Sequence, residues 1–475
     1  MLLQKPAFLL FYHTRAAEAS FGEWLGVLWH GLSLDCTVAG YVTAFPVVVV
    51  LASFWIPLSQ RVWRIILTVY FSLIALVTAA IFAVDLNLYG YWGFRLDGSV
   101  LIYLSDPGEA LASASWGEVL RQIIIMLVYA GAMIWSYRWI LRLFRVEPVS
   151  LRGRIVPTVA ALLIGGLTFL AIRGGVTVAT ANVSKVYFSS NMFLNHAATN
   201  PVFSFLSSVG DNENYAEAYP FFEEERRKTL FEELRGNRPG ADAGTPRLLR
   251  SDRPNVVLIL LESFGRTIMD ETVNGEPVMP NMQRFKREGV WFENFFANSF
   301  RTDRGQVAVL CGFPAQTTMS IMKLPRKSAT LPSLARSLGR EGYRSVFMYG
   351  GDLNFTNQAS FMYSTGWEEL IWQKDMQLDA PTSKWGYADD VVVDLFGDEV
   401  EALGREEQPF LAGLLTLSSH EPFEVPFAKF DDKLLNAMAF SDAQIGRLID
   451  RLRESPVWDN LLVVLVACLL YTSDA

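Results

Sequence analysis

This sequence has few cysteines and no excess of positive charge, and each of these two shortages excludes a class of function. The three cysteines, Cys36, Cys311 and Cys468, stand far apart and show no CxxC spacing. The sequence therefore gives no disulfide framework or cysteine zinc site and predicts ordinary buried thiols. A net charge of -8 over 475 residues gives no reason to expect nucleic acid as a partner.

Long hydrophobic segments, by contrast, fill the first third of the chain. Four of them are long and apolar enough to cross a bilayer, at residues 36–55, 65–84, 122–136 and 155–172. Any one of them could be a buried core helix of a soluble protein. Four within 172 residues favour a transmembrane bundle of four helices over residues 35–172.

The charges between these segments predict their orientation. Arginines gather in the first and third connections, whereas the second connection is mainly acidic. By the positive-inside rule, residues 57–63 and 143–154 are then cytoplasmic, and everything after residue 172 lies outside. Residues 1–34 become an external N-terminal fragment. They carry no signal peptide, and their apolar start, MLLQKPAFLLFYH, suggests the end of a preceding helix that has been lost.

Residues 173–252 read as an extracytoplasmic linker, with a charged amphipathic helix followed by a hinge rich in Gly, Pro and Ala. From residue 253 onward, strand and helix patterns alternate. Strands are expected at NVVLILLES, VWFENFFAN, YRSVFMYG, PFLAGLLTLSSH and LLVVLVA, and helices at PNMQRFKREG, TLPSLARSLGREG and LLNAMAFSDAQIGRLIDRLRES. This alternation predicts an α/β domain with a mainly parallel sheet, whose functional groups lie at the carboxyl ends of the strands.

Three residues are candidates for chemistry at that edge. Glu262 ends the first strand, where a carboxylate is costly to bury unless it is paired or binds a cation; it is either a metal ligand or a hydrogen-bonded structural Glu. Thr302 precedes an apolar helical run, so it is either an activated nucleophile beside N–H groups that hold a phosphoryl oxygen, or a simple N-cap. His420, the one histidine after the hinge, ends another strand and is either functional or structural.

Four segments, taken in their order along the chain, resemble the lipoteichoic acid synthase-like phosphoglycerol transferases of the alkaline phosphatase/sulfatase superfamily. They are NVVLILLESFG, FRTDRGQVAVLCGFP, MYGGDLNFTNQ and SSHEPF. The resemblance runs from residue 255 to the end of the chain, and the preceding multi-span anchor fits it. It implies that Glu262 and Thr302 bind a metal and that Thr302 is the nucleophile. It also implies that His420 and Asp352 bind the substrate.

The same resemblance implies the reaction and its place in the cell. A divalent metal, manganese first and magnesium or zinc otherwise, would assist transfer of phosphoglycerol from phosphatidylglycerol to an envelope glycolipid or glycan acceptor. The reaction would pass through a covalent intermediate on the threonine. Such an enzyme would be a multi-pass protein of the bacterial cytoplasmic (inner) membrane, with its catalytic domain outside the cytoplasm.

Two features depart from the family pattern. The pocket segment reads Thr356-Asn357-Gln358, where the family often has an aromatic-Asn-Arg run. The sequence therefore does not identify which headgroup is transferred. After Ala467 the family continues with Asp-His-Gly, whose Asp and His complete the metal site, but here the chain reads CLLYTSDA. We therefore expect an incomplete catalytic domain at 253–467, a non-native tail at 468–475, truncation at both ends, and no activity from the chain as written.

Alternative functions remain at this point. A phosphoethanolamine transferase would use the same metal and threonine with a different headgroup. A sulfatase-like hydrolase would share the fold, but a true sulfatase needs a C/S-x-P-x-R motif, which the sequence lacks. A non-catalytic membrane protein could keep the fold as a binding platform, and it would hold no metal.

Overall fold

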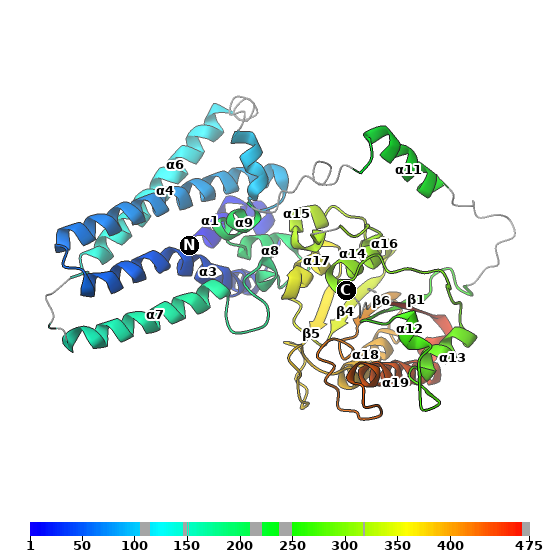
Figure 1. The fold of residues 1–475 in the computed structure, drawn as a ribbon. Coiled ribbons are helices and arrows are strands. Elements are labelled where there is room, and N and C mark those ends of the chain that lie inside the picture. The colour runs from blue at the N-terminus through cyan, green and yellow to red at the C-terminus, as the bar shows by residue number, and fades with distance from the viewer. Residues whose placement is uncertain are drawn as a thin grey trace.

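The computed structural model describes residues 1–104, 115–145, 150, 152–209, 221–236, 249–316 and 319–467. Figure 1 shows a group of long helices from the N-terminal half beside an α/β domain from the C-terminal half. Residues 237–248 of the expected Gly/Pro/Ala hinge, which ends near Arg253-Pro254, lie outside the described residues, as does the tail at 468–475.

Four long apolar helices occur where the sequence predicts the four spans. Within the described ranges, the helices long and apolar enough to cross a membrane are α3 (Phe21–Trp55), α4 (Gln60–Trp92), α6 (Trp116–Leu141) and α7 (Ile155–Arg173), the last preceded by the 3-10 turn η2 (Arg152–Arg154). Helix α4 packs against α6, and α3 packs against α7. Helix α3 begins well before residue 36 because Ser20 and Glu23 form a capping box at its start.

Short helices form a packed layer at one end of this bundle, where α3 and α6 begin and α4 and α7 end (Figure 1). They are α1 (Gln4–Phe11), α2 (His13–Ala16), η1 (Gly98–Leu104), η3 (Val183–Val186), α8 (Met192–Ala198) and α9 (Pro201–Ser208). Their core includes the buried side chains of Phe8, Leu34, Tyr89 and Leu194. The residues before α3 and after α7 are therefore joined in a single structure.

The C-terminal domain is built on a five-stranded sheet in the order β5-β4-β6-β1-β7, and every pairing in it is parallel. Its strands are β1 (Asn255–Leu261), β4 (Arg344–Tyr349), β5 (Glu369–Trp372), β6 (Phe410–Leu415) and β7 (Leu461–Ala467). A small hairpin, β2 (Thr272–Val273) and β3 (Glu276–Pro277), lies outside this sheet. The predicted α/β class with a mainly parallel sheet is confirmed.

Helices cover both faces of the sheet, which explains why its strands are apolar runs rather than alternating patterns. Val257 and Ile259 of β1 face one core, and Leu258 and Leu260 face the other. The first core packs against α13 (Pro280–Glu288), α18 (Asp389–Leu403) and α19 (Lys433–Glu454). The second packs against α14 (Thr302–Cys311), α16 (Leu334–Arg340) and α17 (Gln358–Ser364). The remaining short helices are α11 (Glu224–Gly236), α12 (Arg266–Met269), α15 (Pro325–Ser328), η4 (Ile321–Lys323), η5 (Phe355–Asn357) and η6 (Pro456–Asn460).

Some sequence predictions were wrong. The run VWFENFFAN forms no strand: it is a loop whose aromatic side chains are exposed, with Phe296 78% accessible. The two neighbours of β1 are β6 and β7, so this run has no place beside it in the sheet. The thiol of Cys311 is buried as predicted, but Cys36 is exposed on α3, and Cys468 lies outside the described residues.

The two halves of the chain contact each other through specific polar groups. The Asn182 side chain donates to the carbonyl of Asn354 at 2.8 Å, and the hydroxyl of Ser184 accepts from the buried backbone N–H of Ser360 at 3.0 Å. These bonds attach the segment after α7 to η5 and α17 of the α/β domain. The segment therefore serves as part of an interface as well as a connection.

Candidate active site

The carboxyl edge of the sheet brings Glu262 and Thr302 together. Glu262 directly follows β1 and is only 4% exposed. Its Oε2 accepts a hydrogen bond from the Thr302 hydroxyl at 3.0 Å, although the two residues are 40 positions apart. Ser263 donates to the other carboxylate oxygen at 3.2 Å. A hydroxyl held by a buried carboxylate can lose its proton toward that carboxylate, which is the arrangement an alcohol nucleophile needs.

Thr302 is the first residue of α14 and does not act as its N-cap. The N-cap is Arg301, which makes no side-chain capping bond, whereas the Thr302 hydroxyl points to Glu262. The N-cap alternative from the sequence is therefore wrong for this residue. The first N–H groups of a helix have no acceptor within the helix, so the start of α14 offers donors to an anionic group beside the hydroxyl.

The loop after β6 fixes the position of Glu262. Thr416 accepts from the backbone N–H of Glu262 at 2.8 Å, and Ser419 donates to its carbonyl at 2.7 Å. Both residues are buried. The sequence analysis missed this role, although the polar run TLSS directly after six buried strand residues was a visible signal.

Asp389, at the start of α18, anchors that loop in turn. Its carboxylate accepts from the backbone N–H groups of Leu417 and Ser418 at 2.7 and 3.2 Å, and from the Ser441 hydroxyl at 2.7 Å. Burial raises the pKa of the Asp389 carboxyl, and these donors oppose the rise. The sequence analysis did not identify this residue, because nothing in the sequence pairs position 389 with the loop after β6.

Asp352 and His420 lie at the same edge of the sheet, where each contacts residues close to it. Asp352 follows β4 and accepts from the backbone and side chain of Asn354, at 2.9 and 2.8 Å. His420 follows β6, its Nδ1 lies 2.8 Å from the carbonyl of Glu421, and its ring packs on Trp385. Both residues are partly exposed, so they are open to a ligand at this edge.

Gln358, which stands where the family often has arginine, is buried against α14. It accepts from the side chain of Gln306 at 3.3 Å, and both residues are almost fully buried. Its amide is therefore part of the packing behind the nucleophile's helix. A glutamine amide is neutral, so Gln358 offers a phosphate no positive charge of the kind that an arginine would supply.

Glu262 and Thr302 fit part of a site for a divalent metal. Glu262 and Thr302 supply two oxygen donors, and oxygen donors suit magnesium and manganese. Across the described ranges, no group of three or more His, Cys, Asp and Glu side chains is placed to hold a metal ion. Among the described residues, Glu262 and Thr302 can thus supply two of the ligands of a divalent metal ion. Ala467 pairs with Leu261, so β7 ends level with the residue that precedes Glu262.

The C-terminal domain is similar to known proteins. Residues 254–467 match the family described as Sulfatase. Phosphoglycerol transferase I of Xanthomonas campestris pv. campestris is 34% identical over 240 residues, covering 45% of this chain and 33% of that protein. Lipoteichoic acid synthase 1 of Bacillus subtilis is 26% identical over 242 residues, covering 44% and 35%.

A solved structure, described as a protein in the alkaline phosphatase superfamily from Vibrio parahaemolyticus, aligns with a TM-score of 0.48 at 25% identity, over 54% of this chain and 65% of that one. The chain spans about a third of the length of the curated relatives it matches. The stretch that matches the Sulfatase family, residues 254–467, is thus the α/β domain that follows the four helices able to cross a membrane.

Proposed function

We propose that the protein is a membrane-anchored phosphoglycerol transferase that uses Thr302 as its nucleophile and Glu262 as a metal ligand. The observation that carries this proposal is the hydrogen bond from Thr302 to the buried carboxylate of Glu262, at the start of α14. The names of the two curated relatives support the transferred group. The proposed donor is phosphatidylglycerol, and the proposed acceptor is an envelope glycolipid or glycan.

The chemistry can be assigned to the residues of this chain. The Thr302 oxygen attacks the phosphorus of the lipid phosphodiester, and its proton passes toward Glu262. The bond from phosphorus to the diacylglycerol oxygen breaks, and that oxygen takes up a proton to leave as diacylglycerol. The acceptor hydroxyl then attacks the phosphothreonine ester, which frees Thr302. N–H groups at the start of α14 hold a phosphoryl oxygen during both steps.

A divalent ion, manganese first and magnesium or zinc otherwise, would lower the pKa of the Thr302 hydroxyl and neutralise charge on the phosphoryl group. Glu262 and Thr302 would hold it. By the resemblance, the remaining ligands would be an Asp and a His directly after the strand that matches β7, where this chain reads CLLYTSDA. Asp352 and His420 are proposed to contact the glycerophosphate headgroup from the neighbouring strand ends.

The proposed location is the bacterial cytoplasmic membrane, with the catalytic domain on its outer side. Arg61 and Arg64, in the first turns of α4 next to its connection with α3, and the arginines that flank residue 150 support this orientation. The donor lipid would then be drawn from the outer leaflet, on the same side as Thr302.

The test compares the chain with a chimaera. The chimaera continues after Ala467 with the residues that follow the matching strand of the Xanthomonas campestris relative. We expect the chimaera to release diacylglycerol from phosphatidylglycerol when manganese is present and to stop when the metal is chelated. Release from phosphatidylethanolamine instead would favour the phosphoethanolamine transferase alternative. Release that is unaffected by chelation would contradict the metal-dependent mechanism.

A further inference from the structure

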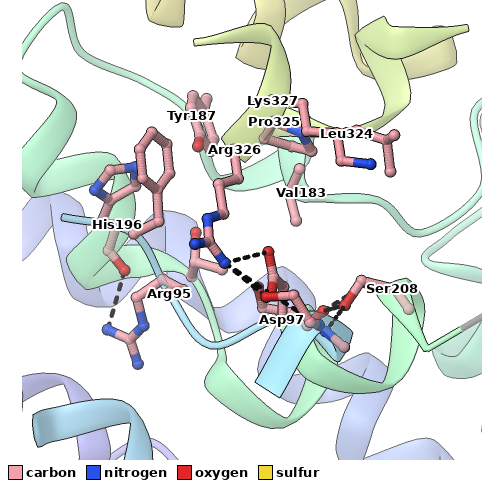
Figure 2. Close-up of a pocket in the computed structure, with 16 residues that line it drawn as sticks. Arg95, Asp97, Val183, Tyr187, His196, Ser208, Leu324, Pro325, Arg326 and Lys327 are labelled. Atoms are coloured by element: carbon pink, nitrogen blue, oxygen red, sulfur yellow. Dashed lines mark hydrogen bonds and ion pairs between the residues drawn. The ribbon is translucent and has the colours of Figure 1, made fainter. Parts of the chain in front are cut away.

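A cavity of about 320 Å³ lies between the two halves of the molecule (Figure 2), and neither Thr302 nor Glu262 lines it. Its wall comes from the segment after α4, from the segment that carries α8 and α9, and from α15 of the α/β domain. Its volume is within the range of roughly 300–1,000 Å³ that is typical of small-molecule sites. The cavity is therefore large enough for a small ligand or a lipid headgroup.

Positive charge dominates the lining of this cavity. Arg95, Arg326 and Lys327 are its cations, and Asp97 is its one carboxylate. Arg326 reaches across from α15 into the cavity (Figure 2), where it donates to Ser99 at 2.6 Å and to Asp97 at 3.3 Å. Arg95 pairs with Asp85 at 2.8 Å. Since each arginine has an acidic partner, Lys327 carries the excess positive charge.

His196 gives a second, independent indication of a ligand. The residue is 5% exposed and lines the cavity, and its Nδ1 lies 3.0 Å from the Tyr89 hydroxyl. Its Nε2 is buried and has no hydrogen-bond partner among the described residues. Burial, together with the nearby Arg95, lowers the pKa of His196 to about 3, so the ring is neutral at physiological pH. When Tyr89 donates to Nδ1, the ring proton sits on Nε2 and is left to donate to a ligand.

We propose that this cavity binds the phosphodiester headgroup of an anionic phospholipid, held by Lys327, Arg326 and His196. A phosphate offers acceptors to all three side chains, and hydroxyls such as that of Tyr187 suit the hydroxyl groups of a headgroup such as glycerol. The position of the cavity favours a membrane lipid over a free phosphate as the ligand. The lining begins at Phe94, directly after α4 ends at Trp92, so a ligand here sits at the end of a membrane helix.

The cavity is also coupled to the nucleophile's helix. Helix α15 follows η4, and just before η4 the Ser320 hydroxyl donates to the backbone carbonyl of Asp303, next to Thr302, at 2.9 Å. A bound lipid would thus hold the α/β domain against the membrane half, at the surface that supports α14. The proposal does not depend on the proposed reaction, because it concerns binding at a site that contains neither Thr302 nor Glu262.

The test measures lipid binding by the full chain in detergent, with native mass spectrometry and dioctanoyl phosphatidylglycerol as the probe. We expect Lys327→Glu and Arg326→Ala each to weaken binding by about tenfold or more, the usual cost of losing a hydrogen bond to a charged group. His196→Phe, which keeps the volume but removes Nε2, should also weaken it. The matched control is Lys323→Glu, an exposed lysine on η4 that does not line the cavity; it should bind like the unaltered chain.

Further arms identify the ligand and guard against misfolding. Dioctanoyl phosphatidylcholine should bind weakly, and inorganic phosphate and glycerol 1-phosphate should compete only at much higher concentrations than the lipid. Lys327 is exposed and forms no ion pair in the described part of the chain, so Lys327→Glu should keep the melting temperature of the unaltered chain. Equal binding by Lys327→Glu and Lys323→Glu would overturn the proposal. Binding that is lost in Thr302→Ala but kept in Lys327→Glu would place the lipid in the catalytic site and overturn it as well.

Discussion

At the scale of single residues, the account depends on one contact, between Thr302 and Glu262. The sequence predicted both residues, because each stands next to an apolar run, where burying a polar group is costly unless it is paired. It could not predict that the two side chains meet at 3.0 Å, since that depends on how α14 packs beside β1. Thr416 and Ser419, which hold the Glu262 backbone, were missed because hydroxyl residues are common in loops.

Replacing the nucleophile should separate its chemical role from its role in the fold. In the chimaera, Thr302→Ala should lower diacylglycerol release by at least about a thousandfold, because the attacking oxygen is gone. Thr302→Ser, which keeps the oxygen, should retain part of the activity. The melting temperature should be unchanged in Thr302→Ser and should fall by only a few degrees in Thr302→Ala, which loses one hydrogen bond to Glu262. Full activity in Thr302→Ala would remove this residue from the mechanism.

The metal role of Glu262 has its own measurement. Glu262→Gln keeps the size of the side chain and an acceptor for Thr302, but it loses the negative charge that attracts a divalent ion. Calorimetric titration of the chimaera with manganese should show at least about a tenfold loss of affinity in this variant. If affinity is unchanged, the ion binds elsewhere and the carboxylate only holds the threonine.

At the scale of elements, the sequence predicted the buried strands well because their apolar runs are bounded by polar or turn residues. It failed at VWFENFFAN, where an aromatic run of the right length is exposed and unpaired with the sheet. It also missed β5, which has only four residues, and α18, whose start is the acidic pair Asp389-Asp390. The length and apolar content of a segment do not show whether it pairs with another strand of the sheet.

The start of α18 leads to a prediction about stability. Asp389→Ala would leave the buried N–H groups of Leu417 and Ser418 without an acceptor, so the free energy of unfolding should fall by about 2–4 kcal/mol. The matched control on the same helix is Asp394→Ala, which breaks only the exposed pair with Arg447 and should cost less than about 1 kcal/mol. Urea denaturation of the full chain in detergent measures both. Equal effects would show that Asp389 does not anchor the loop.

At the scale of the whole molecule, four long apolar helices and an α/β domain followed directly from the sequence. The contact between the two halves did not, because its partners are remote: Arg326 and Asp97, for example, are 229 positions apart. No local pattern links such residues. Contacts of this kind create the cavity at the interface, which is why the cavity could be found only in the structure.

The predicted orientation can be checked by labelling. Lys228 is well exposed on α11, and Arg61 is exposed in the first turn of α4, so each can be changed to cysteine in a chain with Cys36 and Cys468 replaced by alanine. A membrane-impermeant maleimide should label Lys228→Cys in intact cells and Arg61→Cys only after lysis. The reverse pattern would place the α/β domain in the cytoplasm and separate Thr302 from an outer-leaflet donor.

Mass spectrometry can detect the transferred group on Thr302, the residue that we propose as the nucleophile. The chimaera is incubated with phosphatidylglycerol and manganese without an acceptor, quenched and digested. The account predicts a peptide in which Thr302 carries one glycerophosphoryl group, and it predicts that this peptide is absent from Thr302→Ala and from samples treated with a chelator. Diacylglycerol release without such an adduct, or with an adduct on another residue, would contradict the account.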